Sequence, residues 1–273
     1  MASKFGQTVV QNPTGQGKPA TVIFLHGLGD SGQGISAVGQ ALRSSAVPNI
    51  SQVKFVFPTA ETRPVTMNGG MRMPAWFDLD PRIIGSVDNE GINSSISYLE
   101  ELVAEEVKAG VPPERIVIGG FSQGGHIALK YLFQASVAPA ACIALSTWLE
   151  PTFNKQFATE SCKTVRTFLG HGTADPLLPL PLAQSTAALL RQKGLRHVEL
   201  KTYSGMQHST CAEELSDIRN FLSQILPQAD LPTRDEIDRM SVKELKNFLH
   251  SRSIDTRSIL EKSELVERAK AAL

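Results

Sequence analysis

Cysteine is scarce in this sequence of 273 residues, and a net charge is missing altogether. The cysteines are odd in number, and their spacing fits neither a disulfide framework nor a zinc site; they are Cys142, Cys162 and Cys211. The 27 lysines and arginines balance 27 aspartates and glutamates, so no long-range field attracts the chain to nucleic acid or acidic membranes. We expect a reduced, cytoplasmic protein, and the lack of net charge permits a homodimer.

Long apolar runs are also missing. No stretch approaches the roughly 18 apolar residues of a membrane span, and the first ten residues lack the apolar core of a signal peptide. Ala2 stands where a myristoylation motif needs glycine, and the last residues contain no cysteine for prenylation. We therefore expect contact with membranes to be peripheral and transient. Since neither a metal-ligand cluster nor a phosphate-binding loop is visible, we expect no metal and no cofactor.

The sequence does contain an alternation of short apolar runs with helical patterns. The predicted strands are residues 21–26, 54–57, 115–120, 141–146, 166–171 and 197–203. The predicted helices are residues 92–108, 123–134, 182–193 and 212–225. Most of the strands are nearly continuous apolar runs, as expected for strands that are covered on both faces. This pattern predicts an α/β fold with a mostly parallel central sheet flanked by helices.

The last forty or so residues have a different character. They are rich in charge, show no strand pattern and predict two helices, over residues 241–250 and 262–271. A proline-containing segment precedes them and is typical of a linker. We predict a large α/β domain over residues 1–227, a linker over 228–234 and a small helical module over 235–273.

The sharpest local motif is Gly-Phe-Ser-Gln-Gly at residues 120–124, a G-x-S-x-G pattern. It follows an apolar strand directly and leads into a helical run, which is the setting of a nucleophile elbow. Such an elbow lifts a serine above the sheet, so Ser122 is the candidate nucleophile. The alternative is an ordinary turn of glycine and serine between a strand and a helix.

A serine hydroxyl is a poor nucleophile unless a neighbouring base takes its proton. In this kind of fold, an acid and then a histidine follow the serine, each on a loop after a later strand. Asp175 and His208 meet both conditions, and they are the candidate acid and general base. The other histidines fit less well because of their order or position; they are His26, His126, His171, His197 and His250.

Ester hydrolysis by a serine also needs two backbone N–H groups that face the oxyanion. One should belong to Gln123, the residue after the candidate nucleophile. The other should belong to Leu28, because glycines on both sides of it would let its amide turn inward. The alternative for residues 26–30 is a simple glycine turn.

Five motifs together resemble those of the acyl-protein thioesterases, also called lysophospholipase-like carboxylesterases. They are HGLGDSGQG, PVTMNGGMRMPAWFD, GFSQGG, HGTADPLLP and YSGMQHSTC, and they span about residues 20–226. Ile35 stands where the family usually carries tryptophan. The resemblance implies the triad of Ser122, Asp175 and His208, with Leu28 and Gln123 as oxyanion donors. It also implies hydrolysis of palmitoyl thioesters on proteins, of lysophospholipids and of simple esters, with a carboxylesterase for small soluble esters as the alternative.

A long segment without clear periodicity, residues 58–90, is a candidate binding loop. Flexible methionines and aromatic rings in or near it could line a groove for an acyl chain. The candidate groove residues are Met67, Met71, Met73, Trp76, Phe77, Leu177 and Leu178. The alternative is that these side chains fix a long loop to the core.

The helical tail resembles the SAP-type helix–extended–helix module, in its Val-Lys-Glu-Leu start at 242–245 and its Lys-Ser-Glu-Leu-Val start at 262–266. Such modules often bind DNA, which would make the chain a hydrolase that is targeted to nucleic acid. Residues 232–273 hold 9 Lys/Arg and 8 Asp/Glu, a net charge of only +1. DNA affinity depends largely on phosphate neutralisation, so we favour a protein partner over DNA for residues 235–273. The other alternative is a solvated helical appendage without a separate partner.

Overall fold

The computed structural model describes residues 4–15, 18–43, 50–80, 88–226, 232, 234–250, 254–256, 259 and 261–272. Most of the predicted linker, residues 228–234, lies outside this described part. Within the described part, no helix is long and apolar enough to cross a membrane.

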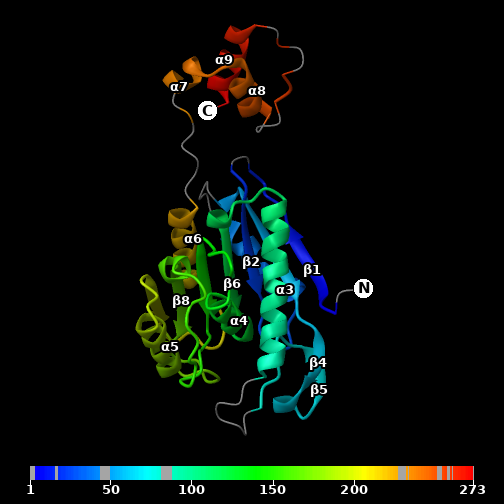
Figure 1. The fold of residues 1–273 in the computed structure, drawn as a ribbon, viewed down its shortest axis with the longest axis vertical. Coiled ribbons are helices and arrows are strands. Elements are labelled where there is room, and N and C mark those ends of the chain that lie inside the picture. Colours follow the sequence, from blue (N-terminus) through cyan, green and yellow to red (C-terminus); the bar gives the residue numbers. More distant parts are fainter. Residues whose placement is uncertain are drawn as a thin grey trace.

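A seven-stranded sheet forms the centre of the large domain, with the strand order β1-β3-β2-β6-β7-β8-β9 (Figure 1). The strands are β1 (Gly6–Gln11), β2 (Ala20–Leu25), β3 (Val53–Thr59), β6 (Ile116–Phe121), β7 (Ala141–Leu145), β8 (Arg166–Gly172) and β9 (Val198–Tyr203). All neighbours pair in parallel except β1, which runs antiparallel to β3 at the edge. The mostly parallel sheet confirms the predicted fold class.

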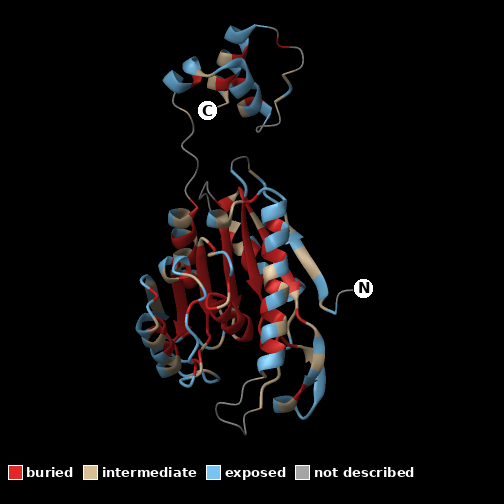
Figure 2. Cartoon of the chain, viewed as in Figure 1, coloured by how far each residue is buried: buried red, intermediate tan, exposed pale blue. Residues whose placement is uncertain are grey.

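Helices cover both faces of this sheet (Figure 2). They are α1 (Gly32–Ile35), α2 (Ala37–Arg43), α3 (Asn89–Lys108), α4 (Gln123–Tyr131), α5 (Leu180–Gln192) and α6 (Ala212–Ile225). Alternate residues of the strands supply two apolar cores. In β2, Ile23 packs in the core with residues of α3, α4 and α5, whereas Phe24 packs in the core with residues of α2 and α6. Burial on both faces explains the continuous apolar runs of the strands.

The segment 58–90 is not the featureless loop that the sequence predicts. It contains a two-stranded antiparallel hairpin, β4 (Thr62–Val65) and β5 (Met71–Pro74), with the short 3-10 helix η2 (Thr66–Asn68) between them. Gly69 and Gly70 close the turn at φ values of 66° and 84°, which glycine adopts without a steric penalty. Each strand is only four residues long and contains a proline, and this hides the period-two pattern. Residues 81–87 lie outside the described part.

The C-terminal module has a small core of its own, and it contains three described helices where the sequence predicts two. They are α7 (Arg234–Arg239), α8 (Val242–His250) and α9 (Lys262–Ala271), with α9 packed against the other two. The shared apolar core consists of Ile237, Leu245, Leu249, Ile259, Leu265 and Ala269. Ser241 and Glu244 form a reciprocal capping box at the start of α8. The six residues of α7 are too few for a helical period to be recognised.

Candidate active site

Ser122 lies at the turn between β6 and α4, in a backbone conformation that few residues other than glycine adopt. Its φ is 53° and its ψ is −117°. The two flanking glycines are needed for steric reasons. A Cβ on Gly120 would lie 2.3 Å from the carbonyl carbon of Gly124, and a Cβ on Gly124 would lie 2.4 Å from the carbonyl oxygen of Leu25. The elbow therefore depends on close approach of three backbone segments.

Hydrogen bonds hold this turn in place. The Ser122 amide donates to the carbonyl oxygen of Leu145 at 2.8 Å, and the Ser122 carbonyl oxygen accepts from the hydroxyl of Thr147 at 2.7 Å. Thr147 is the second residue after the end of β7, at the edge where ligand sites form in parallel sheets. Because Thr147 lies near the end of a predicted strand, its role in supporting the elbow could have been predicted from the sequence.

Asp175 and His208, predicted from their order in the chain, are in contact. The imidazole Nδ1 of His208 lies 2.7 Å from Oδ2 of Asp175. Oδ1 accepts hydrogen bonds from the amides of Leu177 and Leu178, both at 2.9 Å. Burial opposes ionisation of Asp175 and by itself would raise its pKa. The hydrogen bonds from the Leu178 amide, His208 and the Leu177 amide together outweigh burial, so the pKa of Asp175 is lowered. An ionised Asp175 fixes Nδ1–H on His208 and leaves Nε2 available as a base.

His208 also lies against the elbow itself. Its ring packs on that of Phe121, the residue before Ser122, with 4.9 Å between ring centroids. Ser122, Asp175 and His208 thus come from the carboxyl ends of β6, β8 and β9, with the His208 ring beside the Ser122 turn. Ser122 is half-buried and the His208 side chain is 15% exposed, so the cluster is open to a ligand from outside.

The loop that carries Leu28 is fixed by His26. Its Nδ1 donates to the carbonyl oxygen of Gly27, and its Nε2 accepts from the amide of Ala60 at 3.0 Å. Burial lowers the pKa of His26, so the ring stays neutral, as the second of these bonds requires. Through these two bonds His26 supports the loop rather than acting as a base.

Gln123 connects the elbow to the loop after the hairpin. Its side chain accepts from the amide of Trp76 at 2.9 Å and donates to the carbonyl oxygen of Phe77 at 2.7 Å. Among the described residues, the backbone amides of Gln123 and Leu28 donate no hydrogen bond. Two free amides on adjoining segments are what an oxyanion site needs.

The candidate groove residues divide into two sets. Met67, Met71 and Leu177 are 52%, 65% and 66% exposed, Met73 and Leu178 are half-buried, and Trp76 and Phe77 are buried in the core. The indole N–H of Trp76 donates to the carbonyl oxygen of His26. This placement favours the alternative for the two aromatic rings, which fix the loop to the core, whereas the methionines and leucines are exposed or half-buried.

Known protein families match both the large domain and the C-terminal module. A family model described as phospholipase/carboxylesterase matches residues 6–226, and one described as an E3 ubiquitin-protein ligase rififylin-like domain matches residues 230–272. Acyl-protein thioesterase 1 of Neurospora crassa is 41% identical over 77% of this chain and 88% of its own length. The same enzyme of Mycosarcoma maydis is 41% identical over 81% of this chain and 98% of its own.

Solved structures show the same likeness in three dimensions. The crystal structure of Zea mays acyl-protein thioesterase 2 superposes with a TM-score of 0.69 at 28% identity, over 81% of this chain and 99% of that one. Arabidopsis thaliana SOBER1 superposes with a TM-score of 0.69 at 29% identity, over 76% of this chain and 99% of that one. By its sheet, its serine elbow and its match over residues 6–226, the chain belongs to the phospholipase/carboxylesterase family of α/β-hydrolases.

Proposed function

We propose that the chain hydrolyses long-chain acyl thioesters on protein cysteines, and acyl esters of lysophospholipids, with Ser122 as nucleophile, His208 as general base and Asp175 as the orienting acid. The observation that carries this proposal is the 2.7 Å contact between His208 and Asp175 beside the Ser122 elbow. The acyl-protein thioesterases among its relatives supply the substrate class. We also propose a cytoplasmic location.

The proposed mechanism is that of a serine hydrolase. Ser122 attacks the acyl carbonyl while Nε2 of His208 takes its proton, and Asp175 stabilises the imidazolium that forms. The amides of Leu28 and Gln123 donate to the oxyanion. His208 returns the proton to the leaving group, and water then cleaves the acyl-enzyme with His208 as base again. A cysteine thiol has a pKa near 8.5, so its thiolate leaves with little help from a general acid. Thioesters therefore suit this site.

The exposed apolar side chains supply the acyl specificity in this proposal. Met67 and Met71 lie on the hairpin formed by β4 and β5, and Leu177 follows Asp175. The sulfur of Met73 lies against the Leu28 loop, 3.4 Å from where a Cβ on Gly29 would be. These flexible side chains can cover an alkyl chain, and they suit a transient contact with a lipid surface.

We expect the double variant Met71→Asp, Met73→Asp to lose at least tenfold in kcat/KM for palmitoyl substrates and less than threefold for acetyl esters. Two carboxylates would have to be desolvated by the alkyl chain, whereas an acetyl group does not reach them. The measurement is kcat/KM for p-nitrophenyl esters from acetyl to palmitoyl and for a palmitoyl-cysteine peptide.

Arg72→Asp, on the same strand and exposed, is the matched control for added charge. Equal losses for short and long chains would rule out the acyl groove. Activity of the unaltered chain confined to acetyl and butyryl esters would instead indicate a carboxylesterase for small soluble esters.

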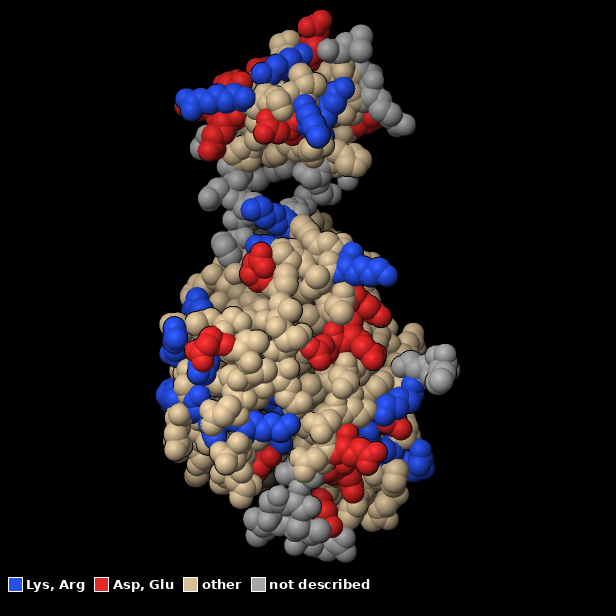
Figure 3. Space-filling view, in the orientation of Figure 1, with Lys and Arg blue, Asp and Glu red and all other residues tan. Residues whose placement is uncertain are grey.

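For the C-terminal module we propose a protein partner. Positive and negative side chains are interspersed on the face that Figure 3 shows, without a continuous basic surface. Interspersed charge gives little phosphate neutralisation, which argues against DNA. Salt-dependent retention of the full chain on DNA, lost when residues 235–273 are scrambled, would contradict this proposal.

A further inference from the structure

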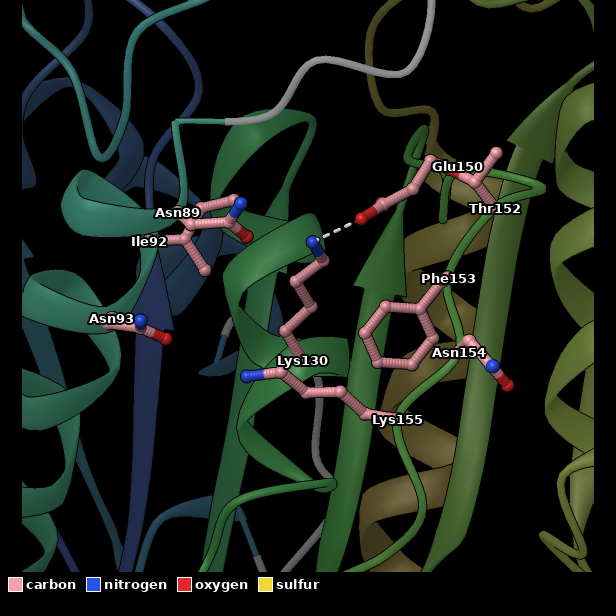
Figure 4. A pocket seen from close by; sticks show the side chains of 9 residues that line it. All are labelled: Asn89, Ile92, Asn93, Lys130, Glu150, Thr152, Phe153, Asn154 and Lys155. Atoms are coloured by element: carbon pink, nitrogen blue, oxygen red, sulfur yellow. Dashed lines mark hydrogen bonds and ion pairs between the residues drawn. The ribbon is translucent and has the colours of Figure 1, made fainter.

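A polar cavity of about 220 Å³ opens between the first turn of α3, the end of α4 and the chain that follows β7 (Figure 4). The residues that matter for its chemistry are Asn89, Asn93, Lys130, Glu150, Phe153 and Lys155. None of these groups belongs to the proposed catalytic site. Lys130 is eight residues after Ser122 along α4, about 12 Å at the helical rise.

Lys130 is the most unusual of these residues, because its side chain is only 5% exposed. Its ammonium forms a short ion pair with Oε1 of Glu150, and it lies 5.2 Å from the centre of the Phe153 ring. An ammonium has three donors, and Glu150 takes one of them. Within the described residues, no acceptor takes the other two. A nearly buried cation with spare donors at a cavity wall calls for an acceptor from outside.

The charges around the cavity do not balance. Lys155 lies close enough to lower the pKa of Lys130, although burial is the larger cause and Glu150 acts in the opposite direction. No acidic partner of Lys155 occurs in the part of the chain that the structure describes. The cavity wall therefore carries two ammonium groups and one carboxylate. Its net charge of +1 favours an anion.

The opposite wall adds neutral hydrogen-bonding groups. Asn89 and Asn93 lie on the first turn of α3, and Figure 4 shows the Lys155 side chain extending across the cavity towards Asn93. The amino-terminal end of this 20-residue helix also has a positive dipole. Amide and ammonium donors thus face the same space from two sides.

We propose that this cavity binds a phosphate group, either as free phosphate or as part of a phospholipid headgroup. A phosphate presents three or four acceptor oxygens at different angles, whereas a carboxylate presents only two in one plane. Donors that converge from α3, α4 and the segment 150–155 match the first of these shapes. The volume admits a phosphate with a short substituent, and none of the residues that line the cavity belongs to the proposed catalytic site.

The test is binding to the full chain, measured by calorimetry with inorganic phosphate and with glycerophosphocholine as probes, and with acetate as the comparison anion. Sodium chloride at matched ionic strength controls for general screening of surface charge. We expect Lys155→Met to weaken binding at least tenfold. Lys108→Met, which removes an equal charge from the exposed other end of α3, should change it less than twofold.

A second variant tests the cavity itself. Asn93→Asp places a carboxylate opposite Lys155 and should abolish binding of both probes, while hydrolysis of p-nitrophenyl acetate shows that the variant is folded. Tighter binding of glycerophosphocholine would indicate a lipid headgroup, and tighter binding of inorganic phosphate a free phosphate. The proposal would be overturned if neither probe binds, or if acetate binds as tightly as phosphate. It would also be overturned if Lys155→Met and Lys108→Met weaken binding equally, or if Asn93→Asp leaves binding unchanged.

Discussion

Ser122→Ala is expected to lower kcat for p-nitrophenyl esters by about 10⁵-fold while leaving the fold intact. Loss of a serine nucleophile removes the covalent route, and the residual rate then comes from the oxyanion donors and substrate binding alone. The stability effect should be small, because alanine is close to serine in size and meets the same φ of 53°. The measurements are kcat, from a single-turnover assay, and Tm.

The control for this variant is Ser204→Ala, which removes an exposed hydroxyl from the turn that precedes His208. It should retain activity within a factor of two. If Ser122→Ala keeps more than about 1% of kcat at an unchanged Tm, the nucleophile lies elsewhere. A large fall in Tm with the loss of activity would mean that the serine is needed for folding rather than for chemistry.

Glu214→Gln is expected to remove a large pH dependence of stability. Glu214 is fully buried near the start of α6, and neither carboxylate oxygen has a hydrogen-bond partner within the described residues. Oε1 lies against the backbone of β8, 2.2 Å from where a Cβ on Gly170 would be. Burial, with a smaller contribution from the charge of Asp217, raises the pKa of Glu214 to about 8. The residue is therefore mostly protonated at physiological pH in the folded chain.

The direction of the effect follows from proton binding. The unfolded chain releases this proton near the ordinary pKa of 4.5, whereas the folded chain keeps it up to about pH 8. Between these values the folded state binds more protons, so the free energy of unfolding falls as the pH rises. At about 1.36 kcal/mol for each unit of pKa shift, the total is roughly 4–5 kcal/mol. Glutamine is neutral throughout and lacks this slope.

The measurement is the free energy of unfolding by urea at several pH values between 4.5 and 9. Relative to the unaltered chain, the free energy of unfolding of Glu214→Gln should increase as the pH rises. The neighbouring Glu213 is exposed, and Glu213→Gln should follow the unaltered chain at every pH. Parallel curves for Glu214→Gln and the unaltered chain would show that the buried carboxyl has an ordinary pKa.

Much of the fold can be predicted from the sequence because the core strands are buried on both faces. The predicted helix over residues 212–225 has the bounds of α6, and the predicted strand over 115–120 differs by one residue from β6. Ser122, Asp175 and His208 follow strand ends, so their order along the chain indicates that they share one edge of the sheet. The contact between Asp175 and His208 agrees with that expectation.

The strands that the sequence pattern does not predict are those whose residues are not consistently buried. β1 lies at the sheet edge and β5 is largely exposed, so neither shows a clear apolar pattern. The positions of Trp76 and Phe77 are equally hard to predict, because both residues form backbone hydrogen bonds with the side chain of Gln123, which is distant in sequence. The cavity beside Lys130 shows the same difficulty, since nothing in a helical run such as IALKYLF distinguishes a buried lysine from an exposed one.

The left-handed backbone of Ser122 has an evolutionary consequence. At a φ of 53°, glycine would avoid a conformational penalty of order 1 kcal/mol that serine carries. Selection for stability alone would therefore favour glycine at position 122, and under the proposed mechanism selection for chemistry keeps the hydroxyl there. Lineages that keep this fold but abandon hydrolysis should drift towards glycine at the elbow, so the residue at this position can serve as a record of whether a homologue is still an enzyme.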